Sequence, residues 1–218
     1  YDAMVPITRR DGDQLRSMGC KLPGHVSPTG INMEDFRKYN NKPEFPSIFH
    51  IGALDWSPNQ EGLDWFLKNI WKDLYSRYPG LKFYIAGRNA PDSIRNIREP
   101  NVVFLGEVDD AYTFMESKAV MIVPLLSGSG MRIKIIEGMA LGKSIVSTSI
   151  GAEGISVEHG KDILIADDPQ KFREGIETIL DNFDTFEVIG RNALDFVEKN
   201  YDNLSISKAL VAFYKELI

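Results

Sequence analysis

The chain has 218 residues, of which 43% are hydrophobic and 26% are charged, and this composition excludes a disordered or fibrous protein. The formal net charge of −6 argues against a general nucleic-acid binder, because such proteins usually carry a basic excess. Cys20 is the only cysteine and no apolar run approaches the roughly 18–20 residues that span a bilayer, so we expect neither an intramolecular disulfide nor a membrane-spanning helix.

The beginning of the chain predicts a short strand, a polar helix around 9–18 and a second strand near Val26. A polar segment at 40–46 follows and marks a predicted domain boundary. Beyond it, apolar strands alternate with amphipathic helices. The predicted strands are 47–51, 81–86, 102–105, 119–123, 144–148 and 163–166. The predicted helices are 59–78, 109–117, 131–141 and three more at the end of the chain.

This alternation predicts an α/β, Rossmann-like fold with a parallel sheet and helices on both faces. Such sheets bind ligands beyond the carboxyl ends of their strands. Those ends are marked by Gly52, Gly87, Gly106, Pro124 and Thr148. We therefore expect the loops that follow these residues to form the functional site.

The segment 124–137 joins a strand to a helix through a loop of glycine and serine. Small residues let the backbone approach a ligand, and the free N–H groups of a helix start favour an anion, commonly phosphate. Arg132 and Lys134 would place two cations in the first turn, where they oppose the helix dipole unless an anion is bound. The alternative interpretation is a flexible turn with two solvated basic residues.

Glu137 lies on the same predicted helix among apolar neighbours, so part of that helix is expected to be buried. A carboxylate on the wall of a pocket can accept hydrogen bonds from a ribose diol. The alternative is an ordinary solvated helix carboxylate.

Residues 137–154, EGMALGKSIVSTSIGAEG, resemble the donor-site signature of GT-B glycosyltransferases of the family 4 type, the group 1 glycosyltransferases. Further blocks at 52–59, 85–87, 104–108 and 123–132 match in the same order. The resemblance covers roughly residues 45–200 and implies the C-terminal half of a GT-B fold.

In this family the resemblance assigns Glu137 to the donor ribose and the backbone near Glu107 and Val108 to the base. A further family glutamate would lie eight positions before Glu137, where this chain has Ser129. The usual basic residues of the first donor-domain loop are absent from 55–59.

We therefore expect Arg132 and Lys134 to neutralise the diphosphate in place of those basic residues. The full set of expected donor-binding residues is Gly52, Gly106, Glu107, Val108, Ser129, Gly130, Met131, Arg132, Lys134 and Glu137. The resemblance leaves the catalytic residues unassigned and implies no metal and no cofactor apart from the nucleotide sugar as co-substrate.

The resemblance also predicts the domain organisation. Residues 1–44 would be the tail of an N-terminal acceptor domain and its linker, 45–200 the donor-binding domain, and 201–218 a helix that packs back toward the missing domain. The chain would then be a fragment of a longer protein.

The resemblance implies a retaining glycosyltransferase. Such an enzyme moves a sugar from a nucleoside-diphosphate sugar to an acceptor hydroxyl and keeps the configuration of the sugar. This chain would be its donor-binding half, inactive alone. The alternatives are a sugar-nucleotide epimerase of GT-B architecture and a non-catalytic nucleotide-binding module, which the serine at position 129 favours.

The expected partners are a nucleotide sugar and a saccharide or lipid-linked acceptor bound through the missing domain, with no nucleic acid. The resemblance implies a role in polysaccharide biosynthesis in the cytoplasm. For the full-length protein it also implies peripheral contact with the inner face of the membrane.

Overall fold

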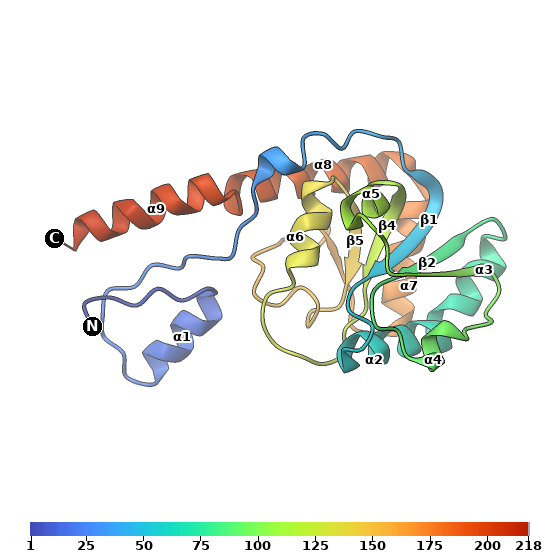
Figure 1. Ribbon diagram of the computed structural model, residues 1–218, viewed down its shortest axis with the longest axis horizontal. Coiled ribbons are helices and arrows are strands. Elements are labelled where there is room, and N and C mark those ends of the chain that lie inside the picture. Colours follow the sequence, from blue (N-terminus) through green and yellow to red (C-terminus); the bar gives the residue numbers. More distant parts are fainter. Residues whose placement is uncertain (218) are drawn as a thin grey trace.

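The computed structural model describes residues 1–217, and at their centre lies a sheet of six strands in the order β3-β2-β1-β4-β5-β6 (Figure 1). The strands are β1 (Glu44–Ile51), β2 (Lys82–Ala86), β3 (Val102–Gly106), β4 (Lys118–Val123), β5 (Ser144–Ser147) and β6 (Leu164–Ile165). The pairings between neighbouring strands are parallel. The prediction of an α/β, Rossmann-like fold is therefore confirmed.

The helices of the described residues follow the predicted alternation. They are α1 (Arg9–Ser17), α2 (Ser57–Phe66), α3 (Lys72–Arg77), α4 (Asp92–Arg95), α5 (Ala111–Glu116), α6 (Ile133–Ala140), α7 (Pro169–Asp181), α8 (Phe183–Asn200) and α9 (Asn203–Glu216). Helix α4 and a 3-10 turn, Met33–Asp35, were not predicted, because such short segments show no periodicity.

The long helix predicted at 59–78 is continuous but not uniform. A π-helical segment, Leu67–Trp71, joins α2 to α3. Pro58 lies in the first turn of α2, where its missing N–H costs no helical hydrogen bond. One face of the unit is fully buried and consists of Leu63, Phe66, Ile70 and Leu74.

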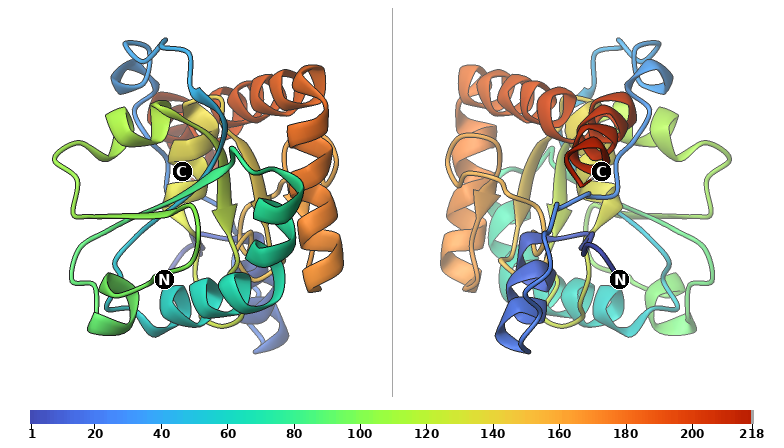
Figure 2. Two further views of the ribbon diagram at one scale, coloured as in Figure 1. Left: turned by 90° about the vertical axis from the view of Figure 1, so that its right-hand side faces the viewer. Right: turned by 90° about the vertical axis from the view of Figure 1, so that its left-hand side faces the viewer.

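Apolar side chains cover both faces of the sheet, and Figure 2 shows helices on either side of it. Strand β1 supplies both faces, because Ile48 belongs to one apolar cluster and Phe49 to the other. Helices α2, α3 and α7 pack with Ile48, whereas α5 and α6 pack with Phe49. Helix α8 contributes to both clusters through Phe186 and Val197. The sheet is therefore the middle layer of three.

Strand β1 begins at Glu44, earlier than the predicted residue 47. The carboxylate of Glu44 accepts hydrogen bonds from Lys118 Nζ on β4 at 2.6 Å and from the Tyr84 hydroxyl on β2 at 2.8 Å. These partners come from the two neighbouring strands, so they let a polar residue start a central strand.

The strands predicted near the N-terminus and near Val26 are not formed. In their place Met4 and Gly24 make one isolated parallel bridge. Pro6, Pro23 and Pro28 lack the N–H groups that a longer ladder would need. The helix predicted between them is present as α1.

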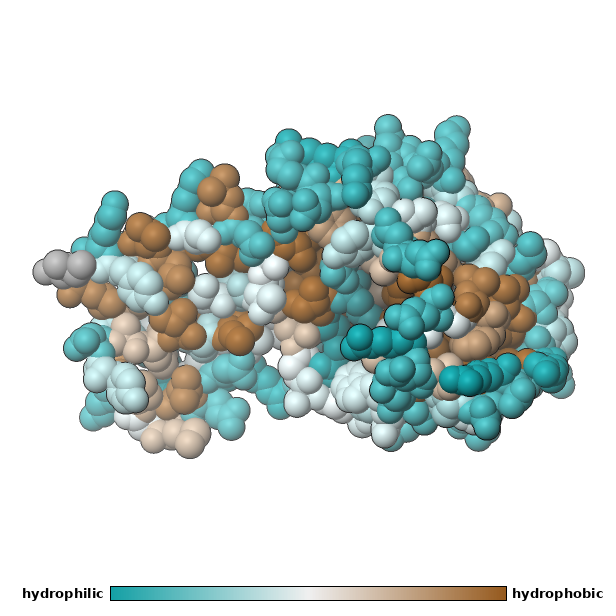
Figure 3. All heavy atoms as spheres, in the orientation of Figure 1, coloured by the Kyte–Doolittle hydropathy of each residue, from teal (hydrophilic) through white to brown (hydrophobic). Residues whose placement is uncertain are grey.

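Residues 1–30 and helix α9 lie together, to one side of the sheet in Figure 1. Ile31 N donates to Tyr201 O at 2.8 Å, Asn203 N donates to Ile31 O at 2.9 Å, and His25 stacks on Phe213 with ring centroids 5.3 Å apart. None of the α9 residues from 203 to 216 is buried. Figure 3 shows apolar side chains at the surface of this part of the molecule, and the helices within residues 1–217 are too short or too polar to cross a membrane.

Candidate functional site

The carboxyl ends of β1 and β4 lie side by side where the strand order reverses direction. From β1 the chain proceeds outward to β2 and β3, and from β4 it proceeds the other way to β5 and β6. Open α/β sheets bind ligands at such a switch point. The loops 52–56 and 124–132 follow β1 and β4, so they frame the candidate site.

Three glycines bring the ends of β1, β2 and β3 together. Gly52 N donates to Ala86 O at 3.2 Å, and Gly87 N donates to Gly106 O at 2.7 Å. A Cβ atom on Gly87 would lie 1.8 Å from Gly52 O, and Gly87 has a φ of +155°. Only glycine therefore fits at position 87, and the predicted residues Gly52 and Gly106 lie at one edge of the sheet.

Arg132 is the N-cap residue of α6, because the helix begins at Ile133 rather than at the predicted residue 131. Its side chain folds back onto the glycine-serine loop. Nη1 donates to Ser129 O at 2.6 Å and to Gly130 O. The guanidinium also lies over the ring of Trp56, 5.1 Å from the ring centroid.

Only some of the hydrogen-bond donors of the Arg132 side chain have acceptors. The residue is 7% exposed, and its Nε and Nη2 atoms are buried without a hydrogen-bond partner among residues 1–217. Burial lowers the pKa of its guanidinium below the usual value. Unpaired buried donors carry a free-energy cost, which a bound anion would remove.

Lys134 reaches from α6 to the end of β1. Its Nζ donates to Ile51 O at 3.0 Å and to Asn59 Oδ1 at 3.1 Å. The Asn59 amide is itself fixed, because Nδ2 donates to Ala53 O at 2.8 Å. Burial, and then the charge of Arg132, lower the pKa of Lys134 to about 7.

Within residues 1–217, neither of these two cations forms an ion pair, and their hydrogen-bond acceptors are carbonyl or amide oxygens. The sequence left open whether Arg132 and Lys134 are simply solvated. The structure instead places both basic groups against the protein, joined to the loops of β1 and β4. The site thus holds positive charge that no carboxylate neutralises.

Glu137 is partly buried and has a specific partner, so it is not a freely solvated carboxylate. The Tyr112 hydroxyl on α5 donates to Glu137 Oε1 at 2.9 Å. Burial, and then this hydrogen bond, raise the pKa of Tyr112 to about 12. The second carboxylate oxygen, Oε2, makes no hydrogen bond among the side chains of residues 1–217.

The remaining predicted residues lie around this centre. Ser129 and Gly130 line a cavity of about 380 Å³ that opens between the loop and α1. Met131 lies beside Gly154, and Val108 packs against the cluster around α5 and α6. Glu107 is exposed and makes no side-chain hydrogen bond within the described part of the chain, so the structure does not join it to the others.

Sequence reasoning missed Trp56, Asn59 and Tyr112. Trp56 and Asn59 lie in the block 52–59 that carries the family resemblance, which was the available signal for them. No local pattern singles out Tyr112, because its contact with Glu137 joins residues 25 positions apart.

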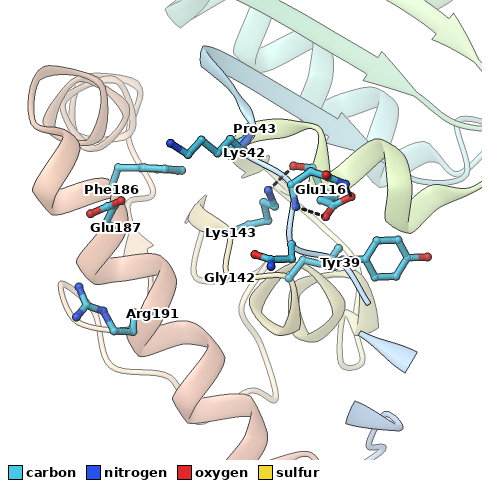
Figure 4. Close-up of a pocket in the computed structure, with 12 residues that line it drawn as sticks. Tyr39, Lys42, Pro43, Glu116, Gly142, Lys143, Phe186, Glu187 and Arg191 are labelled. Carbon is cyan, nitrogen blue, oxygen red and sulfur yellow. Dashed lines mark hydrogen bonds between the residues drawn. The ribbon is translucent and has the colours of Figure 1, made fainter. Parts of the chain in front are cut away.

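A larger cavity, about 490 Å³, lies at the opposite edge of the sheet (Figure 4). Lys143 Nζ donates there to Glu116 O at 2.7 Å and to Lys118 O at 2.9 Å, and burial lowers its pKa to about 8. The Glu116 carboxylate accepts from Asn41 N at 2.7 Å and from Asn41 Nδ2 at 3.0 Å. The bonds from Asn41 to the Glu116 carboxylate join the segment before β1 to α5, and the backbone carbonyls hold the Lys143 ammonium.

Residues 1–217 contain no group of three or more histidine, cysteine, aspartate or glutamate side chains arranged to hold a metal ion.

Comparisons with known proteins give the family and the fold of the chain. Residues 45–182 match the family described as Glycosyl transferases group 1. A Klebsiella pneumoniae protein described as an uncharacterized 44.6 kDa protein in the cps region is 26% identical over 229 residues, which cover 99% of this chain and 56% of that protein. Phosphatidyl-myo-inositol mannosyltransferase of Mycolicibacterium smegmatis is 33% identical over 134 residues, which cover 57% of this chain and 34% of that protein.

Solved structures share the fold. Anabaena Alr3699/HepE in complex with UDP superposes with a TM-score of 0.77 at 16% identity, over 99% of this chain and 64% of that one. Sucrose-phosphate synthase from Thermosynechococcus elongatus gives 0.75 at 18% identity, over 100% of this chain and 58% of that one. The chain thus spans little more than half the length of the Klebsiella pneumoniae relative. By its match over residues 45–182, the chain belongs to the group 1 glycosyltransferase family.

Proposed function

We propose that this chain is the nucleotide-sugar-binding part of a retaining glycosyltransferase, which transfers a sugar from a nucleoside-diphosphate sugar to an acceptor hydroxyl. One observation carries the proposal. Arg132 and Lys134 lie at the carboxyl edge of the sheet without a carboxylate partner, and two buried nitrogen atoms of Arg132, Nε and Nη2, lack an acceptor. A diphosphate supplies both the negative charge and the acceptor oxygens.

The proposed chemistry is stabilisation of a leaving group. As the glycosidic bond to the diphosphate breaks, negative charge grows on the departing phosphate oxygens. The side chains of Arg132 and Lys134 and the free N–H groups at the start of α6 would stabilise that charge. Because protein cations would do this, we propose that the transfer needs no metal.

Two further parts of the nucleotide have proposed binding residues. Glu137 would accept hydrogen bonds from the ribose hydroxyls through Oε2, while Tyr112 holds Oε1. The backbone near Glu107 and Val108 would hold the base. The family resemblance supports the retaining outcome and the cytoplasmic location, and UDP in complex with Anabaena Alr3699/HepE supports a nucleotide ligand.

The domain division at residues 44/45 and 200/201 remains part of the proposal. The acceptor would be a saccharide or a lipid-linked saccharide, and an N-terminal domain outside this chain would bind it. The name of the Mycolicibacterium relative, a phosphatidyl-myo-inositol mannosyltransferase, supports a lipid-linked acceptor at the membrane.

The decisive experiment tests whether Arg132 binds the diphosphate or only stabilises the fold. Binding of UDP, GDP and the corresponding nucleosides is measured by titration calorimetry for the wild-type chain and for Arg132→Met. Loss of a charge-assisted hydrogen bond should weaken diphosphate binding about tenfold or more, while nucleoside binding changes little. Arg98→Met, a change at an exposed arginine before β3, serves as the control.

An equal loss of affinity for nucleoside and diphosphate in Arg132→Met would contradict the proposal. Product analysis of the full-length protein with nucleotide sugars then separates the alternatives. A transferase yields a glycosylated acceptor, an epimerase yields an isomerised sugar nucleotide, and a non-catalytic module yields neither.

A further inference from the structure

Trp56 connects the two loops that meet at the switch point. It precedes α2 and is 38% exposed. Its ring lies 5.1 Å from Arg132 Cζ, although the two residues are 76 positions apart in the sequence. Trp56 therefore ties the loop after β1 to the loop after β4.

Gly128 makes room for this contact. A Cβ atom at position 128 would lie 3.2 Å from two carbon atoms of the Trp56 ring and 2.9 Å from Arg132 Nη2. Gly128 also has a φ of +105°, which side-chain-bearing residues rarely adopt. Trp56, Gly128 and Arg132 thus form a compact stack, with Nη2 facing the bare backbone of the glycine-serine loop.

The chemistry of this stack differs from that of an ion pair. An indole ring attracts a guanidinium through its π electrons and is the strongest aromatic partner for a cation. A carboxylate in the same place would hold Arg132 equally well but would cancel its charge. Trp56 attracts the guanidinium and shields it with an apolar surface, while Nε and Nη2 of Arg132 remain without a hydrogen-bond acceptor.

We propose that Trp56 is a positioning residue of the donor site, which holds the Arg132 guanidinium in place for the diphosphate without neutralising it. This inference rests on the proposed function, because it assumes that Arg132 meets a phosphate. Trp56 acts through Arg132, so its effect should depend on the presence of that arginine. An anion that binds beside Gly128 would accept hydrogen bonds from the unpaired Nε and Nη2 of a guanidinium already held in place.

A double-mutant cycle tests this dependence. UDP, GDP, inorganic pyrophosphate and uridine are titrated into the 218-residue chain as wild type, Trp56→Leu, Arg132→Met and the double variant. Trp56→Leu should weaken binding of the tighter nucleoside diphosphate by about threefold to tenfold and leave uridine binding unchanged. In the Arg132→Met background the same change should have no further effect.

Two controls address folding and the loss of a tryptophan. Trp65→Leu removes an indole from α2, the helix that Trp56 precedes. The Trp65 ring packs on Phe172 with ring centroids 5.4 Å apart, so this variant should keep the wild-type affinity. Trp56→Phe retains a ring and a weaker cation–π contact, so its affinity should lie between those of wild type and Trp56→Leu. If thermal melting shows that Trp56→Leu is unfolded, Trp56→Phe alone and in the double variant carries the test.

The outcomes separate the inference from the proposed function. If wild type binds a nucleoside diphosphate and Trp56→Leu binds it equally well, the role of Trp56 is wrong and the proposed function stands. An undiminished effect of Trp56→Leu in the Arg132→Met background likewise overturns the inference, since Trp56 would then act by another route. If wild type binds neither nucleoside diphosphate nor pyrophosphate, the proposed function fails and the inference fails with it.

Discussion

The charge of Lys134 depends on pH near neutrality. Its pKa of about 7 lies below the ordinary value of 10.5, because the folded chain buries the ammonium group beside Arg132. His50 lies nearby, and burial keeps its pKa well below its usual range, so it stays neutral around pH 7. Between pH 7 and 10 the unfolded chain holds more protons at this lysine than the folded chain, so this group makes folding stability rise with pH.

The affinity for a diphosphate should depend on pH in the opposite direction from folding stability. A bound anion favours the charged ammonium and raises the pKa of Lys134, so the complex takes up a proton. We expect UDP affinity to be highest below pH 7 and to fall as the pH rises from 7 to 9. Calorimetry in buffers of different ionisation enthalpy measures the proton uptake directly.

Lys134→Met is the control for this pH dependence. The nucleotide's own phosphate titrates near pH 6, and that contribution is common to both proteins. The part of the pH dependence above pH 7 should disappear in Lys134→Met. A slope that persists unchanged in the variant would show that Lys134 does not face the diphosphate.

Glu137 should act on a different part of the ligand from Arg132. Glu137→Ala removes an acceptor for ribose hydroxyls, and a charge-assisted hydrogen bond contributes about 1.5–3 kcal/mol. We expect at least about a tenfold loss of affinity, equal for nucleoside and nucleoside diphosphate. Titration calorimetry with both ligands measures it.

Tyr112→Phe is the matched control for Glu137. It removes the hydroxyl that holds Glu137 Oε1 but keeps the carboxylate. Its effect on affinity should be smaller than that of Glu137→Ala. Unchanged nucleoside binding in a folded Glu137→Ala variant would reject the assignment to ribose.

At the scale of elements, the strand ends leave little freedom around the site. Gly87→Ala would place a methyl group 1.8 Å from the Gly52 carbonyl oxygen, and neither backbone can yield without moving the loop that carries Trp56. We expect the free energy of unfolding to fall by about 2 kcal/mol or more. Urea denaturation measures this loss.

Gly80→Ala provides the comparison, because a Cβ atom there meets no atom within 4 Å and the residue has no positive φ. Its effect should stay within about 0.5 kcal/mol. Similar stability losses in the two variants would contradict the idea that close approach of Gly87 to Gly52 shapes this edge.

The elements themselves were largely predictable, since apolar runs bounded by glycine or proline indicate buried parallel strands. Local patterns failed where the deciding contact is distant in sequence. Helix α6 begins at Ile133, after an extended Arg132 whose side chain folds back to the carbonyls of the preceding loop. The location of the site, at the carboxyl ends of β1 and β4, was predictable. Its internal contacts, Trp56 with Arg132 and Tyr112 with Glu137, were not.

At the scale of the whole molecule, the sheet domain is well packed while the part formed by residues 1–30 and α9 is open. Ile7, Met18, Leu204 and Val211 are each more than half exposed. The Arg10–Glu153 ion pair and the packing of Thr8 against Gly154 connect this part to the candidate site. Arg132, Lys134 and Glu137 nevertheless all belong to the sheet domain or its loops.

Binding and transfer should therefore separate in this chain. The 218-residue chain should bind a nucleoside diphosphate, because the proposed ligand groups and the helices that hold them are present on it. It should not transfer sugar, because the proposed acceptor domain lies outside this chain and orientation of the attacking hydroxyl supplies much of the rate of such a reaction. Thermal shift with UDP and GDP, and radiolabelled sugar transfer to cell-derived acceptors, measure the two properties on one preparation. Turnover by this chain at the rate of the full-length protein would show that the acceptor site also lies within these 218 residues, and the proposed division into two halves would then be wrong.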